Sequence, residues 1–223
     1  MIKIKDYYVP KNDTHFIEYL KRNDHYQEEQ RNRAISYVEN WGFAIDIGAN
    51  IGLWSKDLSS YFDRLVCFEP NPYCEDYLKK NINLEKSKIN SCALGEKNEI
   101  KNLFIHPLNS GASSFVNKTK IGFQKDSGAI YGEFPKETLQ KNVEVKKLDD
   151  FNYNNIDFIK IDVQGYELSV LKGAYNTLKL NNPILCIEED NPSNSETIPF
   201  LENLNYVVVD VIVKEHVFKK KQL

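Results

Sequence analysis

The chain has 223 residues, of which 41% are hydrophobic and 12% aromatic, and its formal net charge at pH 7 is −3. This length and apolar content suit one α/β domain with an elaboration, and they exclude a chain that is disordered throughout. The slightly acidic balance argues against a nucleic-acid-binding protein, because such proteins usually carry a basic excess or a basic face.

The first 40 residues are polar and charged, with apolar side chains at the spacing of amphipathic helices. The residues that share a helical face are Phe16, Tyr19 and Leu20 in one segment and Ala34, Ile35 and Val38 in the next. We therefore predict an N-terminal helical extension, 1–40, ahead of the main domain, 41–223.

Beyond residue 40, short apolar runs alternate with segments of helical character. The runs that predict strands are 43–47, 64–68, 88–94, 156–163, 183–189 and 206–213, with a short last strand around Val217 that pairs with 206–213 as a hairpin. Helices are predicted at 52–61, 72–84, 166–180 and 195–204. This alternation indicates an α/β fold with a doubly wound, mostly parallel seven-stranded sheet, which binds ligands beyond the carboxyl ends of its strands.

One segment, 95–150, breaks the alternation. It contains "EIKNLFIHP", "SGASSFVN", a Gly-rich patch at 122–132 and "VEVKKLDDF", which together predict a β-rich insertion and a flexible loop between the third and fourth strands. Long loops inside compact domains are often functional. The hydroxyl and amide groups that are candidates for ligand contact belong to Ser110, Gly111, Ser113 and Ser114.

The turn after the first strand reads "AIDIGANIGLWS" over residues 44–55. It departs from the Gly-x-Gly-x-x-Gly dinucleotide pattern, because Asn50 stands where the second glycine lets a pyrophosphate approach the backbone. Asp46, at the end of the strand, repels a pyrophosphate and attracts an amino group or a sulfonium. The turn therefore favours a positively charged ligand over NAD.

Two further strand ends complete the outline of this ligand. Glu69, in "FEPNP", can accept hydrogen bonds from both hydroxyls of a ribose, and Ala93, in "CALG", leaves room for a flat base. A nucleoside with a positive, phosphate-free tail fits all three strand ends, and S-adenosylmethionine is such a molecule. The alternative for each residue is structural: Asp46 as a helix cap, Glu69 as an exposed turn residue and Ala93 as part of the core.

These stretches, together with "SGASS" and "LDDFNYNNIDFIKIDVQGYELSVLKGA", resemble the FkbM-type methyltransferases from about residue 43 to residue 190. The resemblance implies a class I methyltransferase fold, S-adenosylmethionine as cofactor and O-methylation of a hydroxyl, often on a sugar. This chain has Gln164 where the family often has Glu, which removes one charge near the site. The cofactor-binding residues implied by the matching motifs are Asp46, Gly48, Ala49, Asn50, Gly52, Glu69, Pro70, Asn71 and Ala93.

The candidate catalytic residues follow the later strands. Alternation in "FIKIDV" places Lys160 and Asp162 on one face of the fourth strand. Asp162 is a candidate general base or acceptor-orienting group, with binding of the cofactor's amino group as the alternative. Lys160 is expected to pair with Asp162 or Glu188 and lower the carboxylate pKa, unless it reaches to the sheet edge. Glu188 is expected to face the acceptor cleft, and His106, in the insertion, is a further candidate base.

The four cysteines, at positions 67, 74, 92 and 186, form no Cys-x-x-Cys pair, and three of them lie in apolar runs. No apolar run approaches the roughly 18 residues of a membrane span, and no signal-peptide pattern is present. We therefore expect a cytoplasmic protein. No His, Cys and Asp residues have metal-ligand spacing, so no metal is expected.

The sequence therefore predicts an S-adenosylmethionine-dependent O-methyltransferase that acts on a hydroxyl of a small acceptor, a sugar or glycoconjugate. Two alternatives stay open: an RNA or cap methyltransferase with the same fold, and a non-catalytic nucleoside-binding partner subunit. The lack of a basic stripe argues against the first, and the acidic groups at several strand ends argue against the second. Asn50 argues against an NAD-dependent oxidoreductase.

Overall fold

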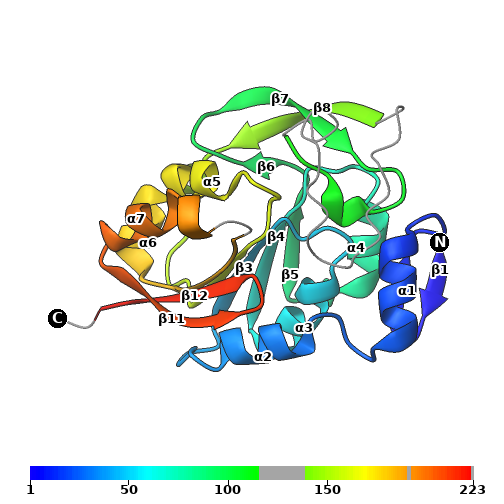
Figure 1. Ribbon diagram of the computed structural model, residues 1–223, viewed down its shortest axis with the longest axis horizontal. Helices are drawn as coiled ribbons and strands as arrows, with labels where there is room; N and C mark the ends of the chain where they lie inside the picture. The colour runs from blue at the N-terminus through cyan, green and yellow to red at the C-terminus, as the bar shows by residue number, and fades with distance from the viewer. Residues whose placement is uncertain (116–138, 190–191, 222–223) are drawn as a thin grey trace.

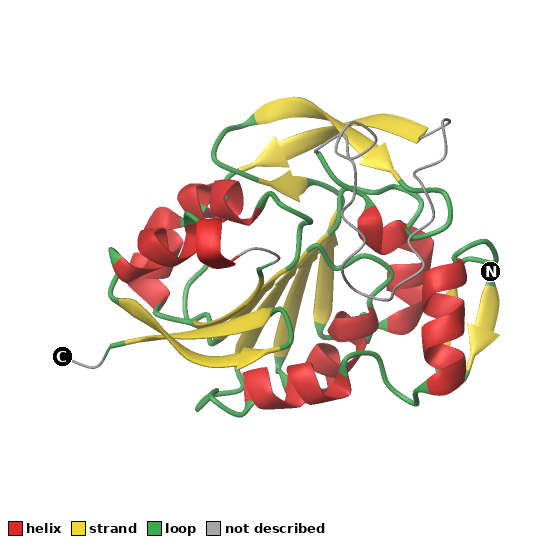
Figure 2. Ribbon diagram, in the orientation of Figure 1, coloured by secondary structure: helices red, strands yellow, loops and turns green. Residues whose placement is uncertain are grey.

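The computed structural model describes residues 1–115, 139–189 and 192–221, so the predicted Gly-rich patch at 122–132 lies outside the described residues. A central seven-stranded sheet has helices on both faces, and a separate three-stranded sheet lies beyond one end of its strands (Figures 1 and 2).

None of the helices in the described ranges is long and apolar enough to cross a membrane. The four cysteines are free and buried.

The central sheet has the strand order β11-β12-β10-β9-β3-β4-β5. Its strands are β3 (Phe43–Ile47), β4 (Arg64–Phe68), β5 (Ser87–Asn90), β9 (Phe158–Ile161), β10 (Ile184–Glu188), β11 (Tyr206–Ile212) and β12 (Glu215–Lys220). Neighbours run parallel except β12, which is antiparallel to both β10 and β11. The doubly wound, mostly parallel sheet is confirmed, and the terminal hairpin places the last strand inside the sheet.

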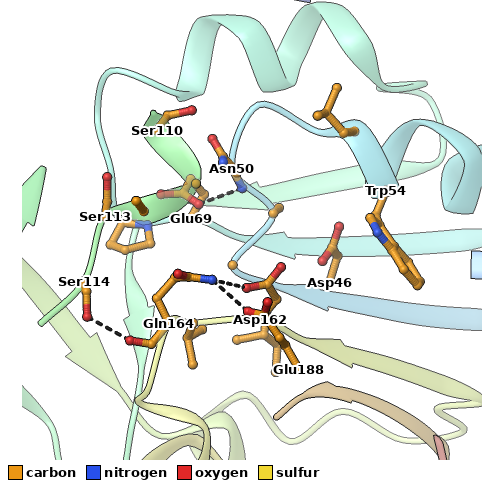
Figure 3. A pocket seen from close by; sticks show the side chains of 18 of the residues that line it. Asp46, Asn50, Trp54, Glu69, Ser110, Ser113, Ser114, Asp162, Gln164 and Glu188 are labelled. Atoms are coloured by element: carbon orange, nitrogen blue, oxygen red, sulfur yellow. Dashed lines mark hydrogen bonds between the residues drawn. The ribbon is translucent and has the colours of Figure 1, made fainter. Parts of the chain in front are cut away.

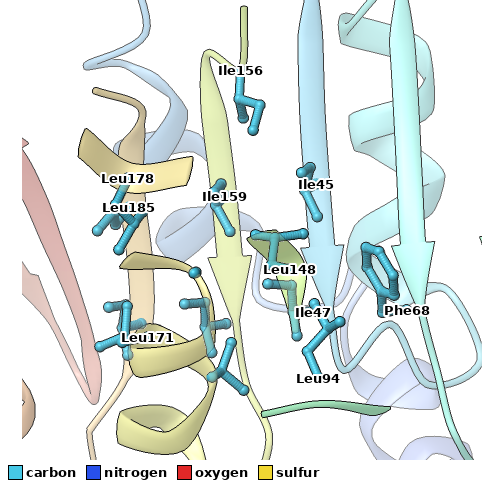
Figure 4. Close-up of a cluster of buried hydrophobic side chains, with 14 of the residues drawn as sticks. Ile45, Ile47, Phe68, Leu94, Leu148, Ile156, Ile159, Leu171, Leu178 and Leu185 are labelled. Atoms are coloured by element: carbon cyan, nitrogen blue, oxygen red, sulfur yellow. The ribbon is translucent and has the colours of Figure 1, made fainter. Parts of the chain in front are cut away.

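Two sets of helices cover the two faces of this sheet. They are α2 (Glu28–Ile35), α3 (Leu53–Tyr61) and α4 (Glu75–Asn81) on one face, and α5 (Glu167–Gly173), α6 (Tyr175–Asn181) and α7 (Thr197–Glu202) on the other. Alternation along β3 sends Ile45 and Ile47 into the core under α5, α6 and α7 (Figure 4), while Ala44 packs in the opposite core. Every residue of β3 is buried, as expected for a central parallel strand.

The predicted helix over 166–180 is interrupted at Ala174, which separates α5 from α6. At the end of α5, a Cβ on Gly173 would meet the carbonyl oxygen of Gly95 at 2.0 Å, so the two backbones touch there. The apolar pattern runs through the break because α5 and α6 cover the same face of the sheet. Periodicity alone therefore predicted one helix where the structure has two.

The third predicted strand, 88–94, is wrong at its C-terminal end. Only β5 pairs with β4, whereas β6 (Ala93–Leu94) pairs with β8 (Leu139–Lys146) in a second sheet of order β6-β8-β7. The third strand of that sheet is β7 (Glu99–Ile105). Short 3-10 helices follow at Ser110–Ala112, Leu148–Phe151 and Pro192–Asn194. The insertion is thus β-rich. Its first strand, β6, lies inside the range 88–94 that was predicted as the third strand of the central sheet.

The N-terminal segment contains a hairpin that the sequence did not predict. The hairpin strands β1 (Ile2–Ile4) and β2 (Tyr7–Val9) precede α1 (Thr14–Arg22) and α2. Strands of three residues are too short to show a clear alternating pattern. The Asn81 side chain holds the hairpin on the domain, because it accepts a hydrogen bond from the Tyr8 amide (2.7 Å) and donates to the carbonyls of Tyr8 (2.9 Å) and Ile51 (2.7 Å).

Candidate functional site

A cavity of about 530 Å³ lies at the carboxyl ends of β3, β4, β9 and β10, at the edge of the sheet that the sequence indicated. Its floor is formed by the strand ends and the turns that follow them. Its roof comes from two other parts of the chain: residues 15–27 of the N-terminal segment and residues 103–115 of the insertion. We use "floor" and "roof" in this sense below.

The glycine turn of the floor is packed against the neighbouring strand end. Gly48 has φ +84°, and a Cβ at this position would meet the carbonyl oxygen of Asp162 at 1.9 Å. The amides of Gly48 and Ala49 donate to the Phe68 carbonyl at 2.9 and 3.1 Å. The absence of a side chain at Gly48 therefore lets the end of β3 lie directly against the end of β9, which brings Asp46 and Asp162 to one cavity.

Glu69 presents its carboxylate to the cavity in a fixed orientation. One oxygen accepts the backbone N–H of Asn50 at 2.7 Å (Figure 3). The other oxygen accepts the backbone N–H of Asn71, also at 2.7 Å. Burial raises the pKa of this carboxyl to about 7, against the effect of the two backbone hydrogen bonds, which lower it. Each oxygen has a second lone pair, so the group can accept two further hydrogen bonds from a ligand.

Asp46 is 1% exposed and is left with one unsatisfied oxygen. Its Oδ2 accepts a hydrogen bond from the Ser55 hydroxyl, while Oδ1 has no hydrogen-bond partner among the described residues. Burial raises the pKa of Asp46, although Lys160 and Ser55 oppose that shift. An unpartnered carboxylate oxygen in a cavity wall is costly, so a cationic ligand group placed there would be stabilised.

Lys160 and Asp162 form an ion pair at the end of β9. Lys160 is 4% exposed, and its Nζ lies 3.1 Å from Asp162 Oδ2 and 5.1 Å from the centre of the Trp54 ring. Burial alone would lower the lysine pKa, but Asp162 and Asp46 hold it above its usual value. Burial likewise opposes ionisation of Asp162, yet Lys160 and hydrogen bonds outweigh it and lower the pKa. Lys160 therefore does not reach the sheet edge, and Asp162 is ionised at neutral pH.

An amide side chain joins the ends of β9 and β10. Gln164 Nε2 donates to Asp162 Oδ1 at 3.0 Å and to Glu188 Oε2 at 2.7 Å (Figure 3). Glu188 thus belongs to the floor, facing the cavity beside Asp162. Across the sheet, Glu188 pairs in register with Glu215 of β12, whose carboxyl pKa is raised by burial.

The roof is aromatic on its N-terminal side. The Tyr26 ring makes edge contacts with Phe16 and Tyr19, at centroid distances of 5.4 and 4.9 Å. Nearby, the indole N–H of Trp54 donates to Gln27 at 2.6 Å. The sequence did not indicate these residues as site residues, because the helical spacing of Phe16 and Tyr19 indicates only that they are buried, and no motif assigns a role to Tyr26, Gln27 or Trp54.

One buried carboxylate joins the two halves of the roof. Asp13 caps α1 by accepting the Phe16 amide at 3.1 Å, and its second oxygen accepts the amide (2.9 Å) and the hydroxyl (2.8 Å) of Ser110. The Thr14 amide also donates to the Leu108 carbonyl at 3.1 Å. The N-terminal segment and the insertion are therefore held together above the floor.

Most of the residues predicted for the site lie in the cavity wall: Asp46, Gly48, Ala49, Asn50, Glu69, Pro70, Ala93, His106, Ser110, Gly111, Ser113, Ser114, Lys160, Asp162 and Glu188. Gly52 and Asn71 do not line it. Gly52, at φ +85°, begins α3 and packs against Leu78, while Asn71 is buried and supports Glu69 through its amide. Both residues hold neighbours in place.

His106 is a poor candidate for a base. Its Nδ1 accepts the Leu108 amide at 3.1 Å, so the neutral ring carries its proton on Nε2. Burial also lowers the pKa of His106, as it does for His15 on the opposite side of the roof. Among the described residues, no group of three or more His, Cys, Asp or Glu side chains is placed to hold a metal ion.

Comparison with known proteins identifies the family of the chain. A family model described as the methyltransferase FkbM domain matches residues 46–208. Methyltransferase 1 of Beauveria bassiana (strain ARSEF 2860) is 27% identical and methyltransferase sdnD of Sordaria araneosa is 30% identical, each over 59% of this chain. These matches cover 57% and 60% of the two proteins, so the chain spans about three fifths of the length of these curated relatives.

A solved structure supports the fold. The crystal structure of methyltransferase FkbM from Methylobacillus flagellatus KT superposes with a TM-score of 0.50 at 18% identity. The superposition covers 80% of this chain and 43% of that one. At this identity the likeness concerns the fold alone, which is that of class I Rossmann-like methyltransferases.

Proposed function

The chain belongs to the FkbM methyltransferase family, and from this premise we propose that it transfers a methyl group from S-adenosylmethionine to a hydroxyl of a small carbohydrate or glycoconjugate acceptor. Class I methyltransferase folds bind S-adenosylmethionine in general. The observation that carries the proposal is that the carboxylates of Asp46, Glu69 and Asp162 line one cavity, each with a different set of hydrogen-bond and ion-pair partners.

The floor fits the proposed cofactor. Asp46 offers an unsatisfied buried oxygen to a cationic amino group, and Glu69 offers two oriented oxygens to a pair of ribose hydroxyls. Ala93, a small buried residue in the wall, leaves space for the base. S-adenosylmethionine supplies a methyl group on a positively charged sulfur, which is electrophilic without a metal ion.

Asp162 is the group proposed to take the proton of the acceptor hydroxyl. Its pKa lies below the usual value despite burial, because the Lys160 charge and side-chain hydrogen bonds with Glu188 and Gln164 stabilise the ionised form. A carboxylate with a lowered pKa is a weak base. This suffices here, since the hydroxyl becomes strongly acidic as its oxygen forms the new bond to carbon.

The acceptor proposed is a carbohydrate because the cavity combines aromatic rings with hydrogen-bond acceptors. Tyr19, Tyr26 and Phe16 offer apolar surfaces from the roof, and Asp162 and Glu188 offer oxygens from the floor. A sugar ring has apolar C–H faces and a rim of hydroxyl groups, which suits such a wall.

Two measurements test this proposal. Calorimetry should detect binding of S-adenosylmethionine and S-adenosylhomocysteine, and absence of binding of both would contradict it. Transfer of a labelled methyl group should then be followed on a panel of free sugars, glycolipids, hydroxylated small molecules and RNA. Labelling of RNA alone, with strong sensitivity to salt, would replace the carbohydrate acceptor by a nucleic acid.

A further inference from the structure

We propose that Gln164 is a positioning residue that holds Asp162 and Glu188 side by side as a pair of hydrogen-bond acceptors directed at the acceptor substrate. The role of Gln164 in methyl transfer rests on the proposed function. The positioning itself is argued from the hydrogen bonds of the Gln164 side chain alone.

The amide of Gln164 is matched to its two partners. A side-chain amide nitrogen has two N–H groups, and here one is directed at Asp162 Oδ1 (3.0 Å) and the other at Glu188 Oε2 (2.7 Å). The ionised carboxylate of Asp162 can only accept hydrogen bonds, so the nitrogen and not the oxygen of the amide must face it. A glutamate of the same length could not donate in this way while ionised.

The backbone of Gln164 is held in the conformation that aims this side chain. Gln164 has φ +57° and Gly165 has φ +95°, a left-handed pair that is uncommon for a non-glycine residue such as Gln164. The Ser114 hydroxyl donates to the Gln164 carbonyl at 2.9 Å, and Glu167 accepts the amides of Val163 and Gly165 at 3.1 Å each. Strained backbone that is held from several directions is typical of functional sites.

The surrounding charges explain why a neutral donor is needed. Lys160 is bonded to Asp162 through the other carboxylate oxygen, Oδ2. Against the effect of burial, the Lys160 charge and side-chain hydrogen bonds with Glu188 and Gln164 lower the pKa of Asp162, so the neutral amide adds a donor beside the Asp162–Glu188 contact without adding a charge. The ionisable groups that face Asp162 are Lys160 on β9, Asp46 on β3, Glu69 after β4, Glu167 on α5, Cys186 and Glu188 on β10, Glu215 on β12 and Tyr26 ahead of α2, with Lys214 in the same cavity wall.

The test is a pH titration of side-chain carboxyl groups by ¹³C NMR on the full chain, which needs no acceptor. The spectrum of Asp162→Asn identifies the Asp162 resonance by its loss. Gln164→Met keeps the side-chain length but removes both donors, so the Asp162 titration midpoint should move up by about one pH unit. Gln164→Glu adds a third carboxylate and should move it further.

Gln140→Glu is the matched control. Gln140 lies exposed on β8, where its oxygen accepts a hydrogen bond from Asn102 (2.7 Å), an interaction that a glutamate can keep. This variant should leave the Asp162 midpoint in place. An unchanged midpoint in Gln164→Met or in Gln164→Glu would overturn the proposal, and either folded variant is sufficient for that result.

A second readout separates this inference from the proposed function. Calorimetry with S-adenosylhomocysteine on the wild-type protein tests cofactor binding alone. If the wild type binds and the Asp162 midpoint does not respond to Gln164, the positioning role fails while the methyltransferase proposal stands. If the Asp162 midpoint responds but the wild type does not bind S-adenosylhomocysteine, the positioning role of Gln164 stands and the methyltransferase proposal fails.

Discussion

The floor and the roof of the cavity are built on different principles. The floor consists of charged side chains at the ends of four neighbouring strands, and its members are Asp46, Glu69, Lys160, Asp162 and Glu188. The roof consists of aromatic, histidine and serine side chains from two segments far apart in the chain, joined through Asp13. Under the proposed function, the chemistry that requires fixed geometry would be placed on the sheet, and the surface that selects the acceptor on segments outside it.

The two regions also differ in how they are held. The floor is supported by strand pairing and by close backbone contact at Gly48. The N-terminal half of the roof packs on the domain through an apolar cluster that contains Phe16 and Leu20. Its link to the insertion depends on a few hydrogen bonds, chiefly those of the buried Asp13 side chain. Changes in the floor should therefore affect the reaction or the whole fold, whereas changes in the roof should act locally.

The strongest test of this contrast is Asp162→Asn. Loss of the base should lower turnover by about 10²–10⁴-fold, because that is the usual contribution of a positioned proton acceptor. Affinity for S-adenosylhomocysteine should change little. Turnover is measured with the acceptor found in the labelling panel, and affinity by calorimetry. A collapse of affinity would instead make Asp162 a ligand of the cofactor.

The packing of the floor is tested by Gly48→Ala. A Cβ would meet the Asp162 carbonyl oxygen at 1.9 Å at a residue with φ +84°, so the free energy of unfolding should fall by about 3–5 kcal/mol. Gly165→Ala is the matched control, since its φ is +95° but nothing lies within 4 Å of the added Cβ. It should cost only about 1 kcal/mol. Equal losses in urea denaturation would show that backbone conformation, not packing, decides both.

The attachment of the roof is tested by Asp13→Ala. The variant loses the cap of α1 and leaves the Ser110 amide without its acceptor, so it should be destabilised by about 2 kcal/mol. Hydrogen exchange should accelerate near residues 107–112 and stay slow in β3 and β9. Asp24→Ala, at an exposed ion pair with Lys5, should leave the stability nearly unchanged. Faster exchange throughout the sheet would contradict a local role of the roof.

The smallest expected effect is the pH dependence of cofactor binding. Burial raises the pKa of Glu69 to about 7, so the protonated form gains population as the pH falls through 7 and the carboxylate loses an acceptor for ribose. Affinity for S-adenosylhomocysteine should therefore be about tenfold weaker at pH 6 than at pH 8. Glu69→Gln should bind more weakly, with a flatter profile. A wild-type affinity independent of pH would remove Glu69 from cofactor binding.

Much of the floor was predictable because its signals are local. Period-two alternation in "FIKIDV" placed Lys160 and Asp162 on one face, and the turn after β3 indicated that a ligand would lie at the carboxyl ends of the strands. The same local reading failed where tertiary contacts decide. Ala93 and Leu94 continue an apolar run, yet they pair with β8 of the insertion rather than with β4.

By itself, the sequence determined the α/β class, the mostly parallel sheet and the strand ends that carry the charged groups, because these depend on residue periodicity and on turns of a few residues. Only the tertiary structure decided what covers those groups. The bond between Asp13 and Ser110 joins residues 97 positions apart, and the amide of Gln164 reaches Glu188, 24 positions away. Contacts of this kind arise when separate segments pack on one sheet, and no local pattern encodes them.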